Sequence, residues 1–214
     1  MAVESLRQGL QCGPTLDLTP IHKYRGEVAG VEDREEAVVL INGACTGTLV
    51  AAAAGPVVLT AGHCVRLQER PVVAFNVEEE PDGEQLVTEG TVLEQSDAPD
   101  FALIRLDTLP AITPTRLATQ PGDLLAVIQH PRGRPKVIAE GRLVGACRGQ
   151  VYYSGLDTLV GSSGAGVLTR SGHLVGVHSG GDCAEDGSGA NRGWTAEAIV
   201  AASAYLEVGD LGDR

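Results

Sequence analysis

The chain has 214 residues and a formal net charge of −12, from 16 Lys and Arg against 28 Asp and Glu. Nucleic-acid binding and docking on an anionic membrane both need a basic face, so this charge argues against both classes. Aromatic residues make up only 3% of the chain, which leaves few platforms for stacked bases. No apolar run reaches the roughly 18 residues that span a bilayer. The composition is that of a globular protein with one large domain or two small ones.

The start of the chain, MAVESLRQGLQCGP, lacks the basic and apolar stretches of a signal peptide. Two alternatives stay open: the protein is cytoplasmic, or a leader was removed before this numbering begins. The first stretch is polar and rich in turn residues. We expect residues 1–34 to form an N-terminal extension or a pro-segment.

Short β-branched and Ala-rich runs, separated by Gly, Pro and Asp, dominate the rest of the chain. Apolar runs of strand length between turn residues predict an all-β sandwich or barrel. The predicted strands cover residues 37–42, 46–51, 57–60, 72–77, 101–106, 124–129, 137–139, 150–153, 166–168 and 174–178.

Three prolines between residues 108 and 122 disfavour pairing within a sheet, so they mark a seam between two β-rich halves. We expect these halves to be residues 35–112 and 113–193. Helical spacing of apolar residues occurs only near the C-terminus, between residues 195 and 208. Thr195 is suited to cap that helix and Glu197 to its first turn. Residues 194–214 are therefore predicted to form a C-terminal helix and tail.

An acidic run, EEEPDGE, occupies residues 78–84. Its simplest interpretation is a solvated loop. A calcium-binding loop is the alternative, because clustered carboxylates suit a hard cation.

Three segments carry side chains suited to chemistry. His63 lies in T-A-G-H-C after an apolar run, so the end of a strand can hold it rigidly. Asp100 opens the apolar run D-F-A-L-I-R-L, and a carboxylate there needs a partner such as an imidazole N–H. Ser163 lies in G-S-S-G-A-G, where glycines permit a tight turn that aims backbone N–H groups into a concavity.

The chain order His63, Asp100, Ser163 matches chymotrypsin-type triads and no other common triad. A free serine hydroxyl is a weak nucleophile. Neutral His63 can take its proton during attack on a carbonyl and return it to the leaving amine. Asp100 would fix the imidazole tautomer, and the amide N–H groups of Gly161 and Ser163 would form the oxyanion hole.

On these three blocks the sequence resembles a trypsin/chymotrypsin-clan serine protease. Residues 140–181 are similar to the bacterial glutamyl-endopeptidase (V8-like) branch, with Asp157-Thr158 before the nucleophile loop and L-V-G-V-H-S-G-G after it. The resemblance covers about residues 35–205. It implies two six-stranded antiparallel β-barrels with the catalytic cleft between them, and a substrate bound as an added strand along residues 177–181.

Two positions depart from the trypsin pattern. Ser162 stands where trypsin-like enzymes have the Asp that pairs with a newly cleaved N-terminal amine, so activation by that ion pair is not expected. Gly166 replaces the usual Pro after the nucleophile.

The resemblance also implies a substrate pocket. In the V8-like branch a His and a Thr or Ser bind a Glu side chain, and the matching residues are His178 and Thr158, with Ser179 and Gly180 beside them. A desolvated carboxylate needs a cation or several donors, and its arrival would raise the pKa of His178. We therefore expect cleavage after Glu, or after Asp. The alternative is that His178 packs in a β-core and specificity is broad.

The five cysteines are Cys12, Cys45, Cys64, Cys147 and Cys183. The resemblance pairs Cys45 with Cys64, beside His63. A second bridge between Cys147 and Cys183 is expected near the substrate pocket, although spacing does not fix connectivity. Cys12 is then left free, or bonds another chain or a lost pro-segment. Disulfides favour secretion.

These observations predict a monomeric serine endopeptidase that acts on proteins or peptides through an acyl-enzyme. No cofactor or metal is expected, since the spacing of Cys and His fits no zinc motif. The N-terminal region raises two further alternatives, a zymogen segment or a new α-amino group that completes the acidic pocket. Two other functions stay open: a catalytically silent, protease-like binding module, and an esterase that uses the same triad.

Overall fold

The computed structural model describes residues 11–212. Residues 1–10 of the expected extension and residues 213–214 of the expected tail lie outside the described residues. The strands are β1 (Thr19–Pro20), β2 (Val38–Ile41), β3 (Cys45–Val50), β4 (Val57–Thr60), β5 (Val72–Phe75), β6 (Leu86–Asp97), β7 (Asp100–Leu106), β8 (Leu117–Ala118), β9 (Leu124–Gln129), β10 (Val137–Cys147), β11 (Gln150–Ser154), β12 (Gly166–Thr169), β13 (Leu174–Gly181), β14 (Asn191–Thr195) and β15 (Leu211–Gly212). The helices are α1 (Val31–Glu35) and α2 (Ala196–Ala202), with 3-10 turns at η2 (Ile21–Lys23), η3 (Gly62–Cys64), η4 (Pro131–Gly133) and η5 (Val208–Asp210).

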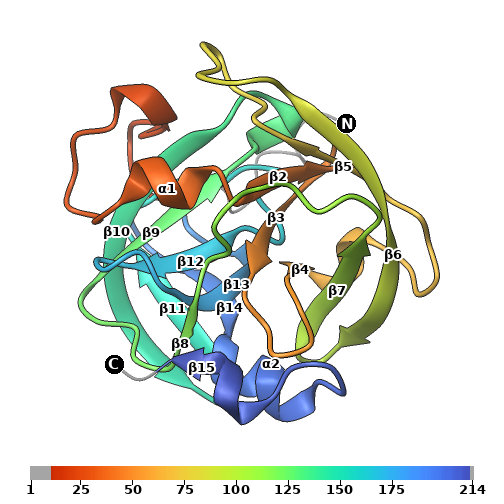
Figure 1. Cartoon of the computed structure of the whole chain (residues 1–214). Helices are drawn as coiled ribbons and strands as arrows, with labels where there is room; N and C mark the ends of the chain where they lie inside the picture. Colours follow the sequence, from red (N-terminus) through yellow and green to blue (C-terminus); the bar gives the residue numbers. More distant parts are fainter. Residues whose placement is uncertain (1–10, 213–214) are drawn as a thin grey trace, which may run out of the picture.

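The first barrel is closed, with the strand order β2-β3-β4-β7-β6-β5. Its strand pairs are antiparallel, from the β2–β3 pair to the β6–β7 pair. In Figure 1 its strands are those drawn in orange and yellow-green. Closure removes the exposed edges that an open sheet of this length would present.

The second barrel follows the order β9-β10-β11-β14-β13-β12, and the pairing of β12 with both β13 and β9 closes it. Short strands attach outside this ring: β1 pairs with β10, β8 with β13, and β15 with β8. The prediction of two six-stranded antiparallel barrels with one C-terminal helix is confirmed.

Strands β4 and β7 are buried on both faces because they lie between the interior of the first barrel and the second barrel. On β4, Val58 packs into the barrel interior, whereas Leu59 packs into the core shared with the second barrel. On β7, Ile104 faces inward and Leu103 faces the shared core. Alternate side chains point to opposite faces of a strand, so one apolar run fills two cores. The chain segments at the ends of these two strands are therefore held rigidly.

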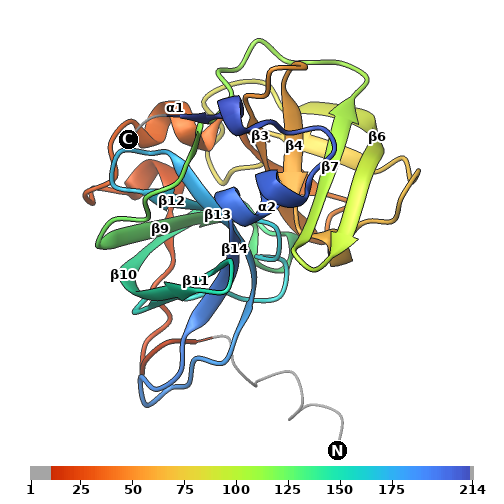
Figure 2. The same ribbon diagram turned by 90° about the horizontal axis from the view of Figure 1, so that it is seen from below.

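Helix α2 covers the junction of the two barrels, as Figure 2 shows. Its Ile199 and Val200 are buried in the shared core. The Thr195 hydroxyl accepts the Ala198 N–H at 3.2 Å, which confirms the predicted N-cap. Just after the helix, the Ser203 hydroxyl donates to Glu94 of β6 at 2.6 Å, so the C-terminal segment ties the first barrel to the second. In residues 11–212 no helix has the length and apolar character needed to cross a bilayer.

Of the twelve barrel strands, two were not predicted, β6 and β14; the two-residue strands β1, β8 and β15 outside the barrels were not predicted either. Both β6 and β14 contain a glycine, which lowers strand propensity but lets another backbone approach closely. A β-carbon on Gly90 of β6 would lie 2.7 Å from the Arg105 carbonyl oxygen, and one on Gly193 of β14 would lie 2.5 Å from that of Val177. The close backbone contacts in the barrels thus require glycine at these positions, and the same glycines interrupt the strand pattern in the sequence.

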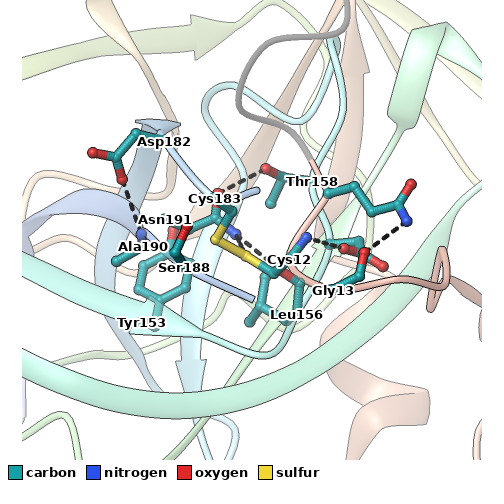
Figure 3. Close-up of a disulfide and its surroundings, with 12 residues drawn as sticks. Cys12, Gly13, Tyr153, Leu156, Thr158, Asp182, Cys183, Ser188, Ala190 and Asn191 are labelled. Atoms are coloured by element: carbon teal, nitrogen blue, oxygen red, sulfur yellow. Dashed lines mark hydrogen bonds between the residues drawn. A yellow bond between two sulfur atoms is a disulfide. The ribbon is translucent and has the colours of Figure 1, made fainter. Parts of the chain in front are cut away.

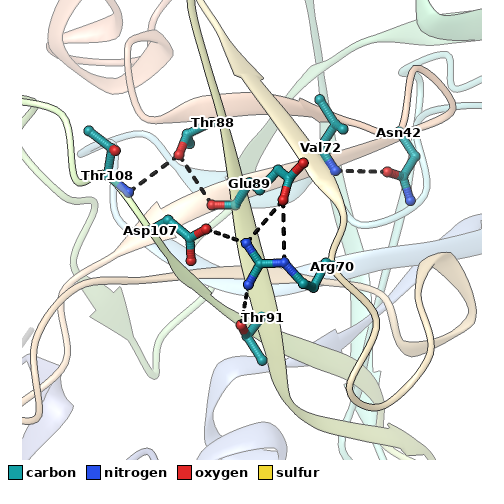
Figure 4. A network of polar contacts seen from close by, with 8 residues as sticks. All are labelled: Asn42, Arg70, Val72, Thr88, Glu89, Thr91, Asp107 and Thr108. Atoms are coloured by element: carbon teal, nitrogen blue, oxygen red, sulfur yellow. Dashed lines mark hydrogen bonds and ion pairs between the residues drawn. The ribbon is translucent and has the colours of Figure 1, made fainter.

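A polar network covers the outer face of the first barrel, where Figure 4 shows Arg70 between two carboxylates. The Arg70 guanidinium donates to Glu89 at 3.0 Å and also to Asp107. All three side chains are about half exposed. Exposed ion pairs contribute little, about 0–1 kcal/mol, so this network adds only modestly to stability.

A second ionic cluster is buried, and it corrects the expectation that residues 78–84 are simply solvated. The Lys136 ammonium donates to the Glu78 carboxylate at 2.7 Å and also to that of Glu35. The side chains of Lys136 and Glu78 are fully buried, whereas Glu79 and Glu80 are exposed. Since Lys136 immediately precedes β10 and Glu78 follows β5, the cluster joins the two barrels.

Candidate active site

His63 and Asp100 lie at the ends of two adjacent strands, β4 and β7. The two oxygens of the Asp100 carboxylate accept different N–H groups of His63: the ring Nδ1–H at 2.8 Å and the backbone N–H at 3.0 Å. An ionised carboxylate can only accept, so the ring proton lies on Nδ1 and leaves Nε2 as a base. The hydrogen bond and the charge of Asp100 raise the pKa of His63 above its ordinary value. His63 is half exposed and open to a substrate.

The loop that carries Ser163 comes from the second barrel and is docked beside His63. The Thr46 N–H donates to the Ser163 carbonyl at 2.9 Å. Cys45, the neighbour of Thr46, forms a disulfide with Cys64, the neighbour of His63. The structure therefore contains the bridge that the resemblance implied, and that bridge fixes the segment around His63 to the strand that holds the Ser163 loop.

Every carbonyl of residues 160–163 has a partner. The Val160 carbonyl accepts the Arg132 N–H at 2.5 Å, and the Ser162 carbonyl accepts the Ala165 N–H at 3.0 Å. The Gly161 and Ser163 carbonyls both accept from Thr46, through its hydroxyl at 2.7 Å and its N–H.

The N–H groups of the same loop fall into two pairs. Those of Ser162 and Gly164 donate to the carbonyls of Leu159 at 2.9 Å and His178 at 2.8 Å. Those of Gly161 and Ser163 donate to no group within residues 11–212. Two unpaired donors separated by a single residue can stabilise one developing oxyanion, which is the arrangement an oxyanion hole requires.

Both glycines that flank the serines are required by close contacts. Gly161 has φ of 99°, and a β-carbon there would lie 2.6 Å from the Arg132 nitrogen and from the His130 carbonyl oxygen. Gly164 has φ of 86°, and a β-carbon there would collide with the Thr60 side chain. Positive φ is readily available only to glycine, so the G-S-S-G sequence dictates the shape of this turn.

His178 is buried in β13, with 3% of its surface exposed. Burial, helped by the nearby charges of His63 and Arg192, lowers its pKa to about 3, so its imidazole is neutral. Its Nδ1 lies 2.6 Å from the Tyr153 hydroxyl. Burial raises the pKa of Tyr153, so its hydroxyl keeps its proton. Either the hydroxyl or the ring can donate in this bond; where the hydroxyl donates, the hydrogen of the neutral His178 ring lies on Nε2.

Thr158 is also buried, and its hydroxyl donates to the Asn191 side-chain oxygen at 3.1 Å. The Asn191 amide in turn donates to the Leu156 carbonyl at 2.8 Å. Asn191 belongs to β14, which pairs with β13 beside His178. The two residues expected to bind the substrate side chain thus belong to neighbouring parts of the second barrel.

The second disulfide differs from the expected one. Cys183 is bonded to Cys12, and Cys147 is a free, exposed thiol, so the predicted Cys147–Cys183 pair is wrong. Figure 3 shows the observed bridge beside Tyr153 and Asn191. The reason lies in Asp157, whose carboxylate accepts the N–H groups of Cys12, at 2.6 Å, and of Asp17. These bonds hold residues 12–17, which we call the N-terminal strap, against the segment that carries Asp157 and Thr158.

On the β12 side, residues 179–181 have no strand partner among residues 11–212. The ladder between β13 and β12 ends at Val177, while β13 continues to Gly181 on its β14 side. Ser179 lies at the register shift of the β13–β14 pair and is half-buried. An extended peptide can pair with such an edge through main-chain hydrogen bonds.

Arg192 was not predicted. It lies opposite Gly180 in the β13–β14 ladder, and its guanidinium approaches to 3.9 Å the point where a Gly180 β-carbon would lie. Within the described chain, its exposed side chain makes no ion pair or hydrogen bond. The signal available in the sequence was an arginine between polar residues of an acidic chain, which is too common to mark a site.

One group of side chains in residues 11–212 could in principle hold a metal: His22, Glu78 and Asp82. Glu78 already uses one carboxylate oxygen for Lys136 at 2.7 Å and the other for His22 at 2.5 Å. We therefore assign no metal there, and the calcium alternative for residues 78–84 gains no support.

His130 is buried and is bonded to the backbone of its own turn. Its Nδ1 donates to the Arg134 carbonyl at 3.0 Å, and burial lowers its pKa to about 4.

Comparisons with known proteins agree with this architecture. The model of the trypsin-like peptidase domain matches residues 45–177. A search of curated proteins gives no significant match.

Many solved structures share the fold, and three serve as examples. A serine endoprotease from Yersinia pestis has a TM-score of 0.65 at 15% identity, over 81% of this chain and 64% of that one. This chain thus spans less than two thirds of that protein's length. The MamO protease domain from Magnetospirillum magneticum, in its apo form, has a TM-score of 0.61 at 15% identity, over 79% and 96%. Deg5 has a TM-score of 0.65 at 19% identity, over 85% and 93%.

Proposed function

We propose, from the premise that this chain belongs to the family of trypsin-like peptidase domains, that it is a serine endopeptidase with Ser163 as its nucleophile. The observation that carries the proposal is the His63–Asp100 hydrogen bond of 2.8 Å, which leaves His63 Nε2 free to act as a base beside the Ser163 loop. The substrates are proteins or peptides.

The reaction begins when the Ser163 hydroxyl oxygen attacks the scissile carbonyl carbon and its proton passes to His63 Nε2. The oxyanion that forms accepts the N–H groups of Gly161 and Ser163. Each such donor lowers the barrier by about 3–4 kcal/mol. The C–N bond then breaks, the amine takes the proton from His63, and an acyl-enzyme remains. Water repeats the sequence and releases the acid.

Asp100 supports both proton transfers without accepting a proton itself. Its carboxylate keeps the imidazole in the tautomer with Nδ1 protonated, and it stabilises the imidazolium that forms. The raised pKa of His63 is the ground-state sign of that stabilisation.

The nucleophile is tested by labelling with a peptidyl phosphonate, followed by peptide mapping. We expect label on Ser163 and none on a Ser163→Ala variant, which should keep the fold and lose turnover. Ser171→Ala, an exposed serine in the β12–β13 turn, serves as the matched control and should label normally. Turnover by Ser163→Ala, or label on another residue, would refute the assignment.

For specificity we propose cleavage after Glu, or after Asp, as in the V8-like glutamyl branch. Neutral His178 would donate its Nε2–H to the substrate carboxylate, and Tyr153 would hold the ring in that tautomer. Arg192 would supply the positive charge that neutral His178 lacks, since a desolvated carboxylate needs a cationic partner. The Thr158 hydroxyl would turn from Asn191 to add a further donor.

The pocket is tested with matched peptides that carry Glu, Gln, Lys or Leu before the scissile bond. We expect the highest kcat/KM for the Glu peptide. In Arg192→Gln, the ratio of kcat/KM for the Glu peptide to kcat/KM for the Gln peptide should become smaller. Arg105→Gln is the control, because Arg105 is exposed on β7 and likewise has no ion pair within the described residues. A preference for Lys or Leu would overturn the pocket assignment and leave the triad untouched.

A further inference from the structure

Thr46 lies on β3 of the first barrel, yet most of its hydrogen bonds reach the second barrel. Its side chain is fully buried. The hydroxyl donates to the Gly161 carbonyl at 2.7 Å and accepts the His130 N–H at 3.0 Å. The backbone N–H donates to the Ser163 carbonyl at 2.9 Å. Thr46 therefore binds the carbonyl groups of Gly161 and Ser163, the same two residues whose N–H groups would form the oxyanion hole.

The orientation of the Gly161 N–H depends on the peptide unit that it shares with the Val160 carbonyl. In a trans peptide the C=O and N–H point in opposite directions. Because the Arg132 N–H holds the Val160 carbonyl at 2.5 Å, the Gly161 N–H points away from Arg132. The position of Arg132 thus determines where this donor points.

The Thr46 hydroxyl helps to fix the position of Arg132. Arg132 belongs to the short turn after β9, and the Gly133 N–H closes this turn on the His130 carbonyl at 3.1 Å. The His130 N–H, at the start of the same turn, donates to the Thr46 hydroxyl. The hydroxyl therefore links the turn that holds the Val160 carbonyl to the Gly161 carbonyl itself. One atom, the Thr46 hydroxyl oxygen, both donates and accepts in this link, as a hydroxyl can and an aliphatic side chain cannot.

We propose that Thr46 is a positioning residue that keeps the Gly161 and Ser163 N–H groups directed toward the oxyanion. The proposal rests on the proposed function, since it assumes that Ser163 is the nucleophile. Thr46 touches no reacting atom. Its loss leaves the buried Gly161 carbonyl and His130 N–H without their partner, so the loop relaxes to satisfy them and the oxyanion donors are displaced.

Thr46→Val is the variant that isolates the hydroxyl. Valine has the same shape, and the backbone N–H bond to Ser163 is kept. Preorganised oxyanion donors act mainly in the transition state, so we expect kcat to fall about 10- to 100-fold while KM changes less than about threefold. Affinity for a peptide boronic acid, which mimics the tetrahedral intermediate, should fall in parallel with kcat. Thr46→Ser should restore most of both.

Thr48 provides a matched control on the same strand. It lies two residues further, is buried to the same degree, and its hydroxyl has no partner within the described chain. Thr48→Val should therefore leave kcat and boronic-acid affinity within about twofold of wild type, because no hydrogen bond is lost. A kcat loss as large as that of Thr46→Val would show that any change in this strand impairs the site, and would overturn the proposal.

Two further outcomes would overturn it. One is wild-type kcat in Thr46→Val, and the other is an equal kcat loss in Thr46→Ser and Thr46→Val. Should Thr46→Val fail to fold, Thr46→Ala, which adds no bulk, takes its place with the same expectation. Failure of the proposed function shows differently, because wild type itself would then take no phosphonate label at Ser163.

Discussion

Asp100 holds His63 by two points, the ring and the backbone, with one carboxylate oxygen for each. A carboxylate bound in this way fixes the position of the imidazole as well as its tautomer. A mutation can therefore test the control of the tautomer separately from the control of the ring's position. An amide in the same place can still accept the backbone N–H, but it can present its NH₂ group to Nδ1.

Asp100→Asn should therefore lower kcat by about 10⁴-fold, because the imidazole would carry its proton on Nε2 and could not act as base. KM should change little, since Asp100 does not contact the substrate. Asp97→Asn is the control, because Asp97 pairs with Asp100 across the β6–β7 turn but is bonded to Gln95 instead. Steady-state kinetics of the two variants on one peptide measures kcat and KM. A loss below about tenfold in Asp100→Asn would contradict the assigned role.

The pH profile should follow the titration of His63. Only the neutral ring accepts the serine proton, so kcat/KM should rise with pH and level off above the pKa of the free enzyme's His63. Asp100 raises that pKa, which places the midpoint above the ordinary value of 6.5. Measurements of kcat/KM from about pH 5 to 9 would test this. A flat profile, or a midpoint below 6.5, would show that another group limits the rate.

The places of His63, Asp100 and Ser163 in the fold could be predicted because each lies in a short motif whose local sequence fixes its setting. Asp100 opens an apolar strand, His63 follows one, and glycines flank Ser163. Their side-chain roles remain predictions until the kinetics above are measured. The apolar runs likewise predicted most strands, since burial on one face or both imposes a readable pattern.

The remaining features depend on contacts between distant segments. The partner of Cys183 is set by the strap, which Asp157 binds from about 140 residues away. Arg192 lies beside Gly180 only through the register of β13 and β14. Thr46 lies in a predicted strand, but its partners exist only where the two barrels meet. Periodicity describes one element at a time, so none of these relationships can be read from it.

The N-terminal strap should shape the substrate pocket. It is bonded at Asp157, the neighbour of Thr158, and through Cys12 to Cys183, which follows β13. In the double variant Cys12→Ser, Cys183→Ser we expect KM to rise several-fold with a smaller change in kcat. Loss of a native disulfide costs about 2–5 kcal/mol, so Tm should fall as well.

The control for the strap is Cys147→Ser, which removes the exposed free thiol and should change neither KM nor Tm. A reductant is a poorer test, because it would also open the Cys45–Cys64 bridge beside His63. An unchanged KM in the double variant, with Tm lowered, would show that the strap stabilises the fold without acting on the pocket.

The buried cluster of Lys136, Glu35 and Glu78 should make stability depend on one ammonium group. Lys136→Met leaves two buried carboxylates without their cation, and breaking a buried ion pair in this way costs about 3–5 kcal/mol. Lys23→Met is the matched control. Lys23 and Glu79 are 3.8 Å apart and both 64% exposed, so their pair contributes less than about 1 kcal/mol. Urea unfolding at neutral pH measures both.

The same variant predicts how stability should change with pH. In wild type, burial outweighs Lys136 and raises the pKa of Glu35 to about 7. Burial also acts to raise the pKa of Glu78, but its hydrogen bonds to Glu35 and Lys136 outweigh burial and lower that pKa instead. Without the ammonium, the pKa of Glu35 should rise further and that of Glu78 should rise as well. A carboxyl whose pKa is raised by folding binds more protons folded than unfolded, so stability increases as pH falls through the folded pKa. The free energy of unfolding that Lys136→Met loses relative to wild type should therefore become smaller as the pH falls from about 7.5 to 5. This interval lies roughly above the pKa of Glu in an unfolded chain. Adding Glu35→Gln should remove part of the deficit at pH 7.5, because one charge is gone. An equal deficit at both pH values would show that Lys136 acts through packing of its alkyl chain instead of through its charge.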